Sequence, residues 1–261
     1  MQGFWDLLHC WDDFCAPLAF LAAAEALRVT VPLCREFSLP VAPSKVAGSS
    51  TSINFLRIEI NLLKQELRLP EAKLAQLLST LHLWSTRRSA TKRQLQSFIG
   101  QLSHAAAVVR PGRSFMRHLI DTMAIPRRQH HRVRLNLQCK ADMAWWLLFV
   151  QGWNGVAFLP NLQVGEAVVA DASGAWGCGA YTRKTLEWFQ LPWPSSWDGT
   201  NIAAKELLPL VMAAAVWGKS WHGTLVHVWS DNQAVVAVLS SHSAHNPQLM
   251  HFLRCLFFFQ A

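Results

Sequence analysis

Alternation of apolar and polar residues is clearest in the second half of the chain, where it predicts elements that each carry one carboxylate. Residues 168–181 begin as an apolar strand, reach Asp171 at its end and turn through glycines into a second strand. Glu206 lies within residues 201–212, an apolar run that is typical of a helix. Asp231 ends a further apolar strand. The pattern therefore places three carboxylates at or on hydrophobic elements.

In the first half, the patterns predict a hairpin followed by helices. Residues 53–60 and 66–69 alternate like two short strands. Pro70 begins a helix whose leucines recur at helical spacing. Thr91 and Gln94 form a capping-box sequence, which predicts that a second amphipathic helix starts there.

Three further helices are expected, near residues 16–37, 115–123 and 138–151, and the last is rich in tryptophan. Residues 152–162 gather Gly, Asn and Pro, so the natural domain boundary lies there. Because of their large apolar area, most tryptophans are expected in the core or at its rim. This expectation covers Trp145, Trp146, Trp176, Trp188, Trp193 and Trp197.

Length and composition narrow the class of protein. The 261 residues suffice for one large or two modest domains with real cores. Although 51% of the residues are hydrophobic, no apolar run approaches the roughly 20 residues that a membrane span needs. The six cysteines contain no C-x-x-C pair, which argues against a zinc site or a disulfide framework. We therefore expect an intracellular protein, cytoplasmic or nuclear, with reduced thiols and no membrane association.

The net charge of +8 is unevenly distributed. Residues 84–140 contain twelve Lys or Arg and one acid, whereas residues 160–261 contain five basic and six acidic residues. A local basic excess of this kind favours a polyanion partner, here nucleic acid, over a merely solvated basic face. The residues expected to contact nucleic acid along one broad face are Arg87, Arg88, Lys92, Arg93, Arg110 and Arg113.

Asp171, Glu206 and Asp231 are candidates for a shared cation site. A carboxylate beside hydrophobic structure is costly unless a charge compensates it, and three of them indicate a divalent cation. Their separations of 35 and 25 residues mean that only folding can bring them together. Taken singly, each has an ordinary alternative: Asp171 as a turn residue, Glu206 as an exposed helix residue and Asp231 as an Asx-turn former.

The order of elements around these carboxylates resembles ribonuclease H. That order is a strand with Asp, a Gly-rich hairpin, a strand, a helix with Glu, a strand ending Ser-Asp-Asn, and a helix. The upstream part resembles the end of a retroelement reverse transcriptase of the gypsy-related, DIRS-like type. The stretches that carry this second resemblance are residues 55–60 (FLRIEI), 94–100 (QLQSFIG), 109–115 (VRPGRSF), 145–146 (WW) and 153–155 (WNG).

The resemblance implies an α/β fold with three parts. Residues 1–69 would be an α+β remnant of the polymerase palm, and residues 70–152 a basic helical thumb or connection. Residues 160–261 would be a ribonuclease H-like domain with a mixed sheet and helices, truncated at its C-terminus. Trp11-Asp12-Asp13-Phe14 lies where the family has its polymerase box, with Cys10 at the position of the tyrosine, so Asp12 and Asp13 would correspond to ligands of the polymerase metals. The ordinary alternative for these two aspartates is a polar helix start. No polymerisation is expected, because the other polymerase elements are not in this sequence.

By the same resemblance, Asp171, Glu206 and Asp231 are catalytic metal ligands. Two Mg²⁺ ions about 4 Å apart activate water and stabilise the leaving oxygen in such sites, and Mn²⁺ is a possible substitute. The implied reaction is hydrolysis of RNA in RNA/DNA hybrids, expected to be weak in this truncated chain. The alternative is a non-catalytic nucleic-acid-binding remnant of a retroelement, and the sequence leaves the choice between enzyme and remnant open. It is silent on protein partners.

Overall fold

A computed structural model describes residues 8–10, 13–15, 20–43, 46, 48, 50–64, 66–154, 157–158, 164–221 and 224–260. Near the N-terminus, β1 (Leu8–Cys10) pairs antiparallel with β2 (Asp13–Cys15), and α1 (Phe20–Glu36) follows. This helix confirms most of the one expected over residues 16–37. Among the described residues, no helix has the length and apolarity to cross a membrane.

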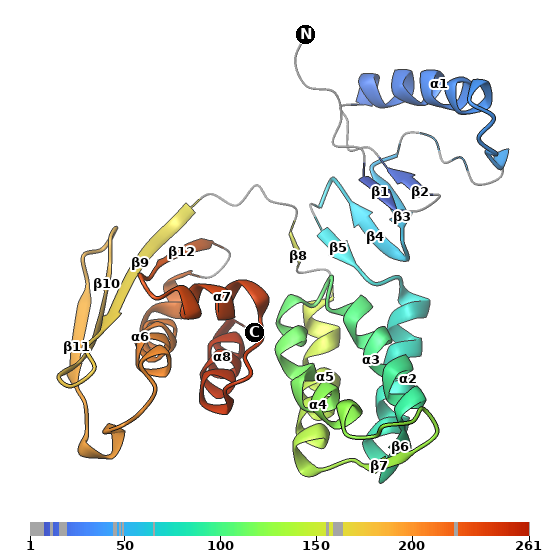
Figure 1. Cartoon of the computed structure of the whole chain (residues 1–261). Coiled ribbons are helices and arrows are strands. Elements are labelled where there is room, and N and C mark those ends of the chain that lie inside the picture. Colours follow the sequence, from blue (N-terminus) through green and yellow to red (C-terminus); the bar gives the residue numbers. More distant parts are fainter. Residues whose placement is uncertain are drawn as a thin grey trace.

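A four-stranded antiparallel sheet comes next (Figure 1). Its order is β3 (Ser52–Phe55), β4 (Ile58–Asn61), β5 (Glu66–Arg68) and β8 (Ala157–Phe158). The prediction of a single strand over residues 53–60 is wrong, because that stretch is itself a hairpin. Leu56 and Arg57 form its turn, both with positive φ (50° and 63°), as the type I′ form of a two-residue hairpin turn requires.

Four helices form the middle of the chain: α2 (Glu71–Thr86), α3 (Lys92–Ala105), α4 (Arg117–Ala124) and α5 (Leu137–Trp153). The capping box at Thr91 and Gln94 is confirmed, and it starts α3 where expected. The 3₁₀ helix η2 (Arg110–Met116) joins α3 to α4. Gly112 lies against the Trp146 indole, so a Cβ at this position would overlap that ring.

One feature of this helical part was not expected. The end of the basic connector forms β7 (Arg132–Arg134), which pairs antiparallel with β6 (Ser89–Thr91). Lys140 on α5 fastens the chain just before β6, since its ammonium donates to the carbonyl oxygens of Trp84 and Ser85 at 3.1 and 2.8 Å. The β6–β7 pair therefore closes one end of the helical part.

The C-terminal part is a mixed sheet with helices on one face (Figure 1). Its strand order is β11 (Trp188–Pro192), β10 (Gly177–Thr182), β9 (Val164–Ala172) and β12 (Leu225–Trp229). Within this sheet β12 runs parallel to β9, whereas the β9–β10 and β10–β11 pairs are antiparallel. Its helices are α6 (Ile202–Trp217), α7 (Gln233–Ser241) and α8 (Pro247–Gln260), with the 3₁₀ turns η3 (Ser195–Trp197) and η4 (Gly218–Trp221). The expected α/β class is confirmed, and the expected elements follow one another in the expected order, but β11 and α8 were not predicted.

The two faces of this sheet differ in what covers them. Val168 and Ala180 are buried on the face that packs against α6. The other face carries Tyr181, Trp188 and Trp229, which are 41, 71 and 54% exposed. The expectation for tryptophan is therefore confirmed only in part. Trp145 and Trp146 are buried and Trp193 and Trp197 half-buried, whereas Trp176 and Trp188 are exposed.

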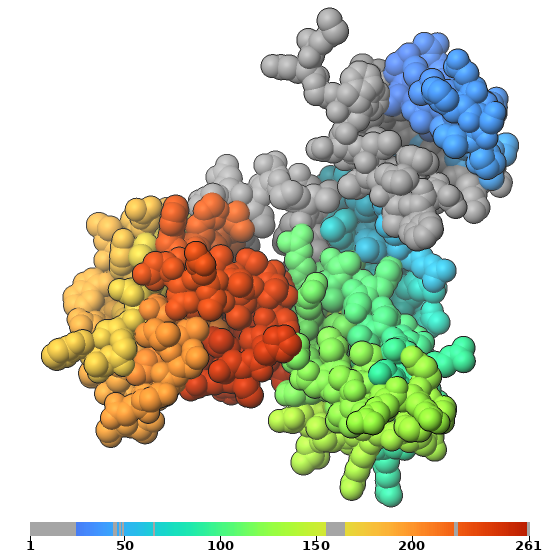
Figure 2. All heavy atoms as spheres, viewed as in Figure 1, coloured from blue at the N-terminus to red at the C-terminus, as the bar shows by residue number. Residues whose placement is uncertain are grey.

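The C-terminal helix packs against the helical part, as Figure 2 shows where the two regions meet. At this junction Asp142 of α5 is fully buried, and its carboxylate accepts hydrogen bonds from Arg254 of α8 (2.7 Å) and from the His118 ring (3.0 Å). Arg254 also donates to the carbonyl oxygen of Ser114 at 3.0 and 3.1 Å. We call this group the α8 junction. It fixes the C-terminal part against the helical part through a buried ion pair.

Candidate metal centre

Strand register brings Asp171 and Asp231 together at the carboxyl ends of two neighbouring parallel strands, β9 and β12. Asp171 is the penultimate residue of β9. On the neighbouring parallel strand, Trp229 is level with Val169. Asp231 follows Trp229 by two residues, so it lies close to the level of Asp171.

Helix α6 supplies the third carboxylate. The Asn201 side chain caps this helix by accepting a hydrogen bond from the Ala203 amide at 2.9 Å. Glu206 lies about one turn further along, on a face that is buried against β9 and β10. Packing of α6 on the sheet therefore points Glu206 toward the strand that carries Asp171.

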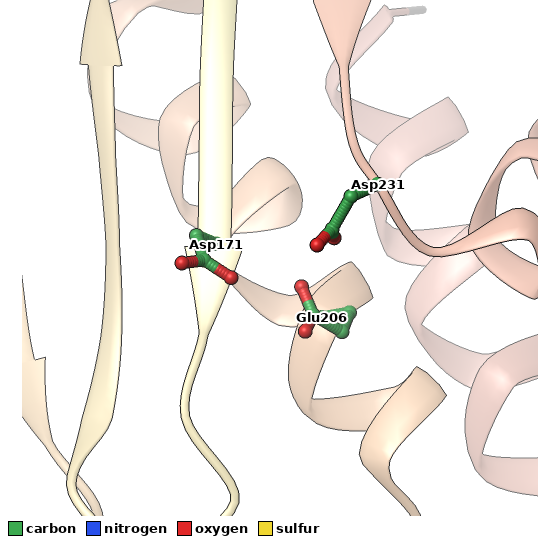
Figure 3. Close-up of side chains that lie close together, drawn as sticks. All are labelled: Asp171, Glu206 and Asp231. Carbon is green, nitrogen blue, oxygen red and sulfur yellow. The ribbon is translucent and has the colours of Figure 1, made fainter.

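The three carboxylates converge, as their positions in the sequence predicted (Figure 3). Each offers one oxygen, and these three oxygens lie within 4.8 Å of one another. Glu206 is 6% exposed, whereas Asp171 and Asp231 are exposed. The group thus has a buried side formed by Glu206 and an open side formed by the two aspartates, and it can hold a cation.

The electrostatics of the group follow from this geometry. Burial, reinforced by the negative charges of Asp171 and Asp231, raises the pKa of Glu206 from 4.5 to about 7. Its Oε2 atom is buried and accepts no hydrogen bond from any residue that the structure describes. Burial and the nearby Glu206 also raise the pKa of the Cys178 thiol to about 11. A buried oxygen without a donor, in a group of like charges, is what a divalent cation would compensate.

Two residues lie beside the centre that were not predicted to take part in it: Lys205, and Trp193, which was expected only as a core or rim aromatic. Lys205 is 3% exposed, and its ammonium donates to the carbonyl oxygen of Gly174 at 2.6 Å. The indole N–H of Trp193 donates to the carbonyl oxygen of Ser173, also at 2.6 Å. Both therefore hold the turn that directly follows β9. The available signal was Lys205 itself, a cation inside an otherwise apolar helix and adjacent to Glu206.

The six basic residues expected to contact nucleic acid fall into two groups. Arg87, Arg88, Lys92 and Arg93 lie around the β6–β7 pair, where Arg87 and Arg88 line a groove with Arg134. Arg110 and Arg113 are exposed on η2, beyond the other end of α3. With 14 residues, α3 separates the two groups by roughly 20 Å. Their role as nucleic-acid contacts stays a prediction.

The proposed remnant of a polymerase box lies largely outside the described residues. Asp12 is not among them, and Asp13 is described only as the first residue of β2. Their expected correspondence to ligands of the polymerase metals therefore stays a prediction.

Comparisons with known proteins gave distant structural similarities. No protein-family model matches the chain, and no curated protein matches it. Similar solved structures include the foamy viral protease-reverse transcriptase with an RNA/DNA hybrid, at 13% identity and a TM-score of 0.39 over 88% of this chain and 31% of that chain. The dRH form of that protein with double-stranded DNA is 12% identical, with a TM-score of 0.43 over 95% of this chain and 43% of that chain. The foamy viral protease-reverse transcriptase with double-stranded DNA is 12% identical, with a TM-score of 0.38 over 88% of this chain and 48% of that chain. The chain spans less than half the length of each of these chains.

Proposed function

We propose that the chain is part of a DIRS-like retroelement reverse transcriptase/ribonuclease H and that it cleaves the RNA strand of RNA/DNA hybrids with Mg²⁺. The observation that carries this proposal is the convergence of Asp171, Glu206 and Asp231 from β9, α6 and the end of β12. The proposed parts are a palm remnant (residues 1–69), a helical thumb or connection (70–152) and a ribonuclease H-like domain (160–261).

The residues at the centre fit a hard divalent cation. All three ligands are carboxylate oxygens, which suit Mg²⁺. Glu206 supplies a buried oxygen that has no donor within the described part of the chain. Because its pKa is near 7 without a cation, this carboxyl group must release its proton for the cation to bind fully near neutral pH. When bound, Mg²⁺ supplies an activated water and neutralises charge on the leaving oxygen.

The protein's own contribution to such a reaction is positional. Asp171 and Asp231 are exposed, so a phosphodiester can approach from their side of the group. Glu206 lies in the apolar packing of α6, which keeps water away from the opposite side. The register of the parallel strands β9 and β12 fixes the spacing of the two aspartates. These three features would together orient a phosphate that binds at the carboxylates.

The experiment that tests the proposal is a cleavage assay on an end-labelled RNA/DNA hybrid with Mg²⁺ or Mn²⁺. We expect slow, metal-dependent cleavage of the RNA strand and none of duplex DNA. Asp171→Asn should abolish it, whereas the matched variant Asp198→Asn, at an exposed acid outside the centre, should behave as the wild type. Cleavage that persists in Asp171→Asn, or that needs no metal, would contradict the assignment.

The basic groups predict how hybrid binding depends on salt. Neutralised phosphates release counterions, so affinity should fall steeply between about 50 and 200 mM salt. Reversing Lys92 and Arg93 to Glu should weaken binding of all sequences alike, because phosphate contacts carry no base information. Lys219→Glu, outside both groups, is the control. Fluorescence anisotropy measures both effects, and an affinity independent of salt would refute the nucleic-acid interpretation.

A second candidate function is binding of nucleic acid without turnover. The observation that favours it is that the six basic residues lie around the β6–β7 pair and on η2, in the helical part of the chain, so that binding through them does not require the carboxylate centre. In this case hybrid would bind with the same salt dependence in the wild type and in Asp171→Asn. Neither protein would cleave with Mg²⁺ or Mn²⁺.

A further inference from the structure

The turn between β9 and β10 is held by side chains from two other elements. This turn, residues 173–176, begins two residues after Asp171 and is closed by a hydrogen bond from the Ser173 amide to the Gly177 carbonyl (2.8 Å). Lys205 of α6 donates to Gly174, and Trp193, which follows β11, donates to Ser173. The backbone after Asp171 is therefore tied to the helix that carries Glu206.

Stability does not explain a lysine at position 205. Its ammonium is buried, and removing an ion from water costs several kcal/mol unless it is well paired. None of the described residues forms an ion pair with Lys205. Its compensation is the Gly174 carbonyl and the face of the Trp193 ring, whose centroid lies 5.4 Å from Nζ. A long apolar side chain would fill the same space without this desolvation cost.

The helix itself is weakened at this point. Pro209 lies inside α6 and has no N–H, so the Lys205 carbonyl receives no helical hydrogen bond from position 209. The turn of helix that presents Glu206 thus has one backbone restraint fewer than a regular helix. The bond from Lys205 to Gly174 supplies a restraint in its place.

Ring stacking holds Trp193, the second side chain that contacts the turn, in place. The Trp193 ring stacks on Trp197, with centroids 5.1 Å apart and an interplanar angle of 5°. Trp197 stacks in turn on Phe252 of α8, at 5.9 Å and 11°. Trp193 therefore offers its N–H and its ring face from a position that the core holds in place.

We propose that Lys205, together with Trp193, is a positioning pair that sets the separation of Asp171 and Glu206 and thereby the cation affinity of the centre. The pair touches neither cation nor substrate; it acts by holding the turn after Asp171 at a fixed place relative to α6. The proposal rests on the proposed function, in that the three carboxylates must hold a divalent cation. Loss of groups that orient metal ligands typically lowers metal affinity by about 10- to 100-fold.

The test measures Mn²⁺ binding to the full chain by electron paramagnetic resonance, beside urea unfolding followed by tryptophan fluorescence. Lys205→Met keeps the length and packing of the side chain but removes the donor. We expect Mn²⁺ affinity to fall at least tenfold, with stability equal to or above that of the wild type. Lys219→Met makes the same chemical change at an exposed position and should alter neither quantity.

Trp193→Phe is the second variant, because it keeps an aromatic ring and deletes only the N–H donor. It should weaken Mn²⁺ binding in the same direction, and it decides the matter if Lys205→Met does not fold. Unchanged Mn²⁺ affinity in the folded variants overturns the positioning role. If the wild type and Asp171→Asn both fail to bind Mn²⁺, the proposed function itself fails, which is a distinguishable result.

Discussion

Replacing Glu206 by Gln should remove a pH dependence from the stability of the metal-free protein. Burial and the charges of Asp171 and Asp231 raise the pKa of Glu206 to about 7 in the folded chain, against 4.5 ordinarily. Between these values the folded chain keeps this proton while the unfolded chain loses it. The free energy of unfolding therefore falls as pH rises from 4.5 to about 7. Above about pH 7 the loss of stability caused by the ionised Glu206 stays at its full size.

The size of the effect follows from the interval between the two values. Since one pKa unit corresponds to about 1.4 kcal/mol, the penalty at high pH amounts to roughly 3 kcal/mol. Gln has the shape of a protonated Glu, so the two proteins should be similarly stable at pH 5. At pH 8.5 the variant should be the more stable by about that amount.

The assay is urea unfolding followed by tryptophan fluorescence from pH 5 to 8.5, in EDTA and again in excess Mg²⁺. The quantity to compare is the difference in unfolding free energy between the wild type and Glu206→Gln at each pH, because the contributions of groups that titrate alike in both proteins cancel in that difference. Glu187→Gln, at an exposed glutamate, is the control. Saturating Mg²⁺ should stabilise the wild type more than the variant at pH 8.5. Parallel stability curves for wild type and Glu206→Gln would refute the electrostatic argument.

Three further predictions concern the fold. Asp142→Asn leaves the Arg254 guanidinium without its buried counter-ion and should cost about 3 kcal/mol in urea unfolding, whereas Asp121→Asn, in an exposed pair, should cost under about 1 kcal/mol. Gly112→Ala drives a methyl group into a core indole, so a loss of about 1–3 kcal/mol is expected by the same measurement, and an unchanged value would contradict the packing. Thr91→Ala removes the N-cap of α3 and should lower stability by about 1 kcal/mol, and no loss would mean that the cap contributes nothing.

The parts of the structure that sequence patterns predicted are those encoded locally. The capping box at Thr91 involves residues three apart, and the leucines of α2 repeat within one helix. Each carboxylate of the candidate centre was found because it stands out against an apolar element, and the order of elements indicated that folding would bring the three together. What the patterns did not contain was the register of β9 against β12, which decides how close Asp171 and Asp231 lie.

The features that were missed depend on unusual backbone or on distant residues. A two-residue turn with positive φ is normally signalled by Asn or Gly, and Leu56-Arg57 carries neither signal. The β6–β7 pair joins two three-residue strands about forty residues apart, too short for alternation to be visible. Asp142 and Arg254 are 112 residues apart, and nothing near either one marks it as half of a buried pair.

Under the proposed function, the α8 junction has a consequence for where a nucleic acid would be cut. Because Arg254 and the buried Asp142 carboxylate lock the C-terminal helix to the helical part, the carboxylate centre cannot swing freely relative to the arginines on η2. A duplex that contacts both the arginines on η2 and the carboxylate centre would then be cleaved at a fixed distance from the phosphate that the arginines bind. The number of base pairs between that phosphate and the cleaved bond would be constant, whatever the sequence. A variant with a weakened α8 junction would still cleave, but at several neighbouring positions instead of one, so that products of several lengths would appear.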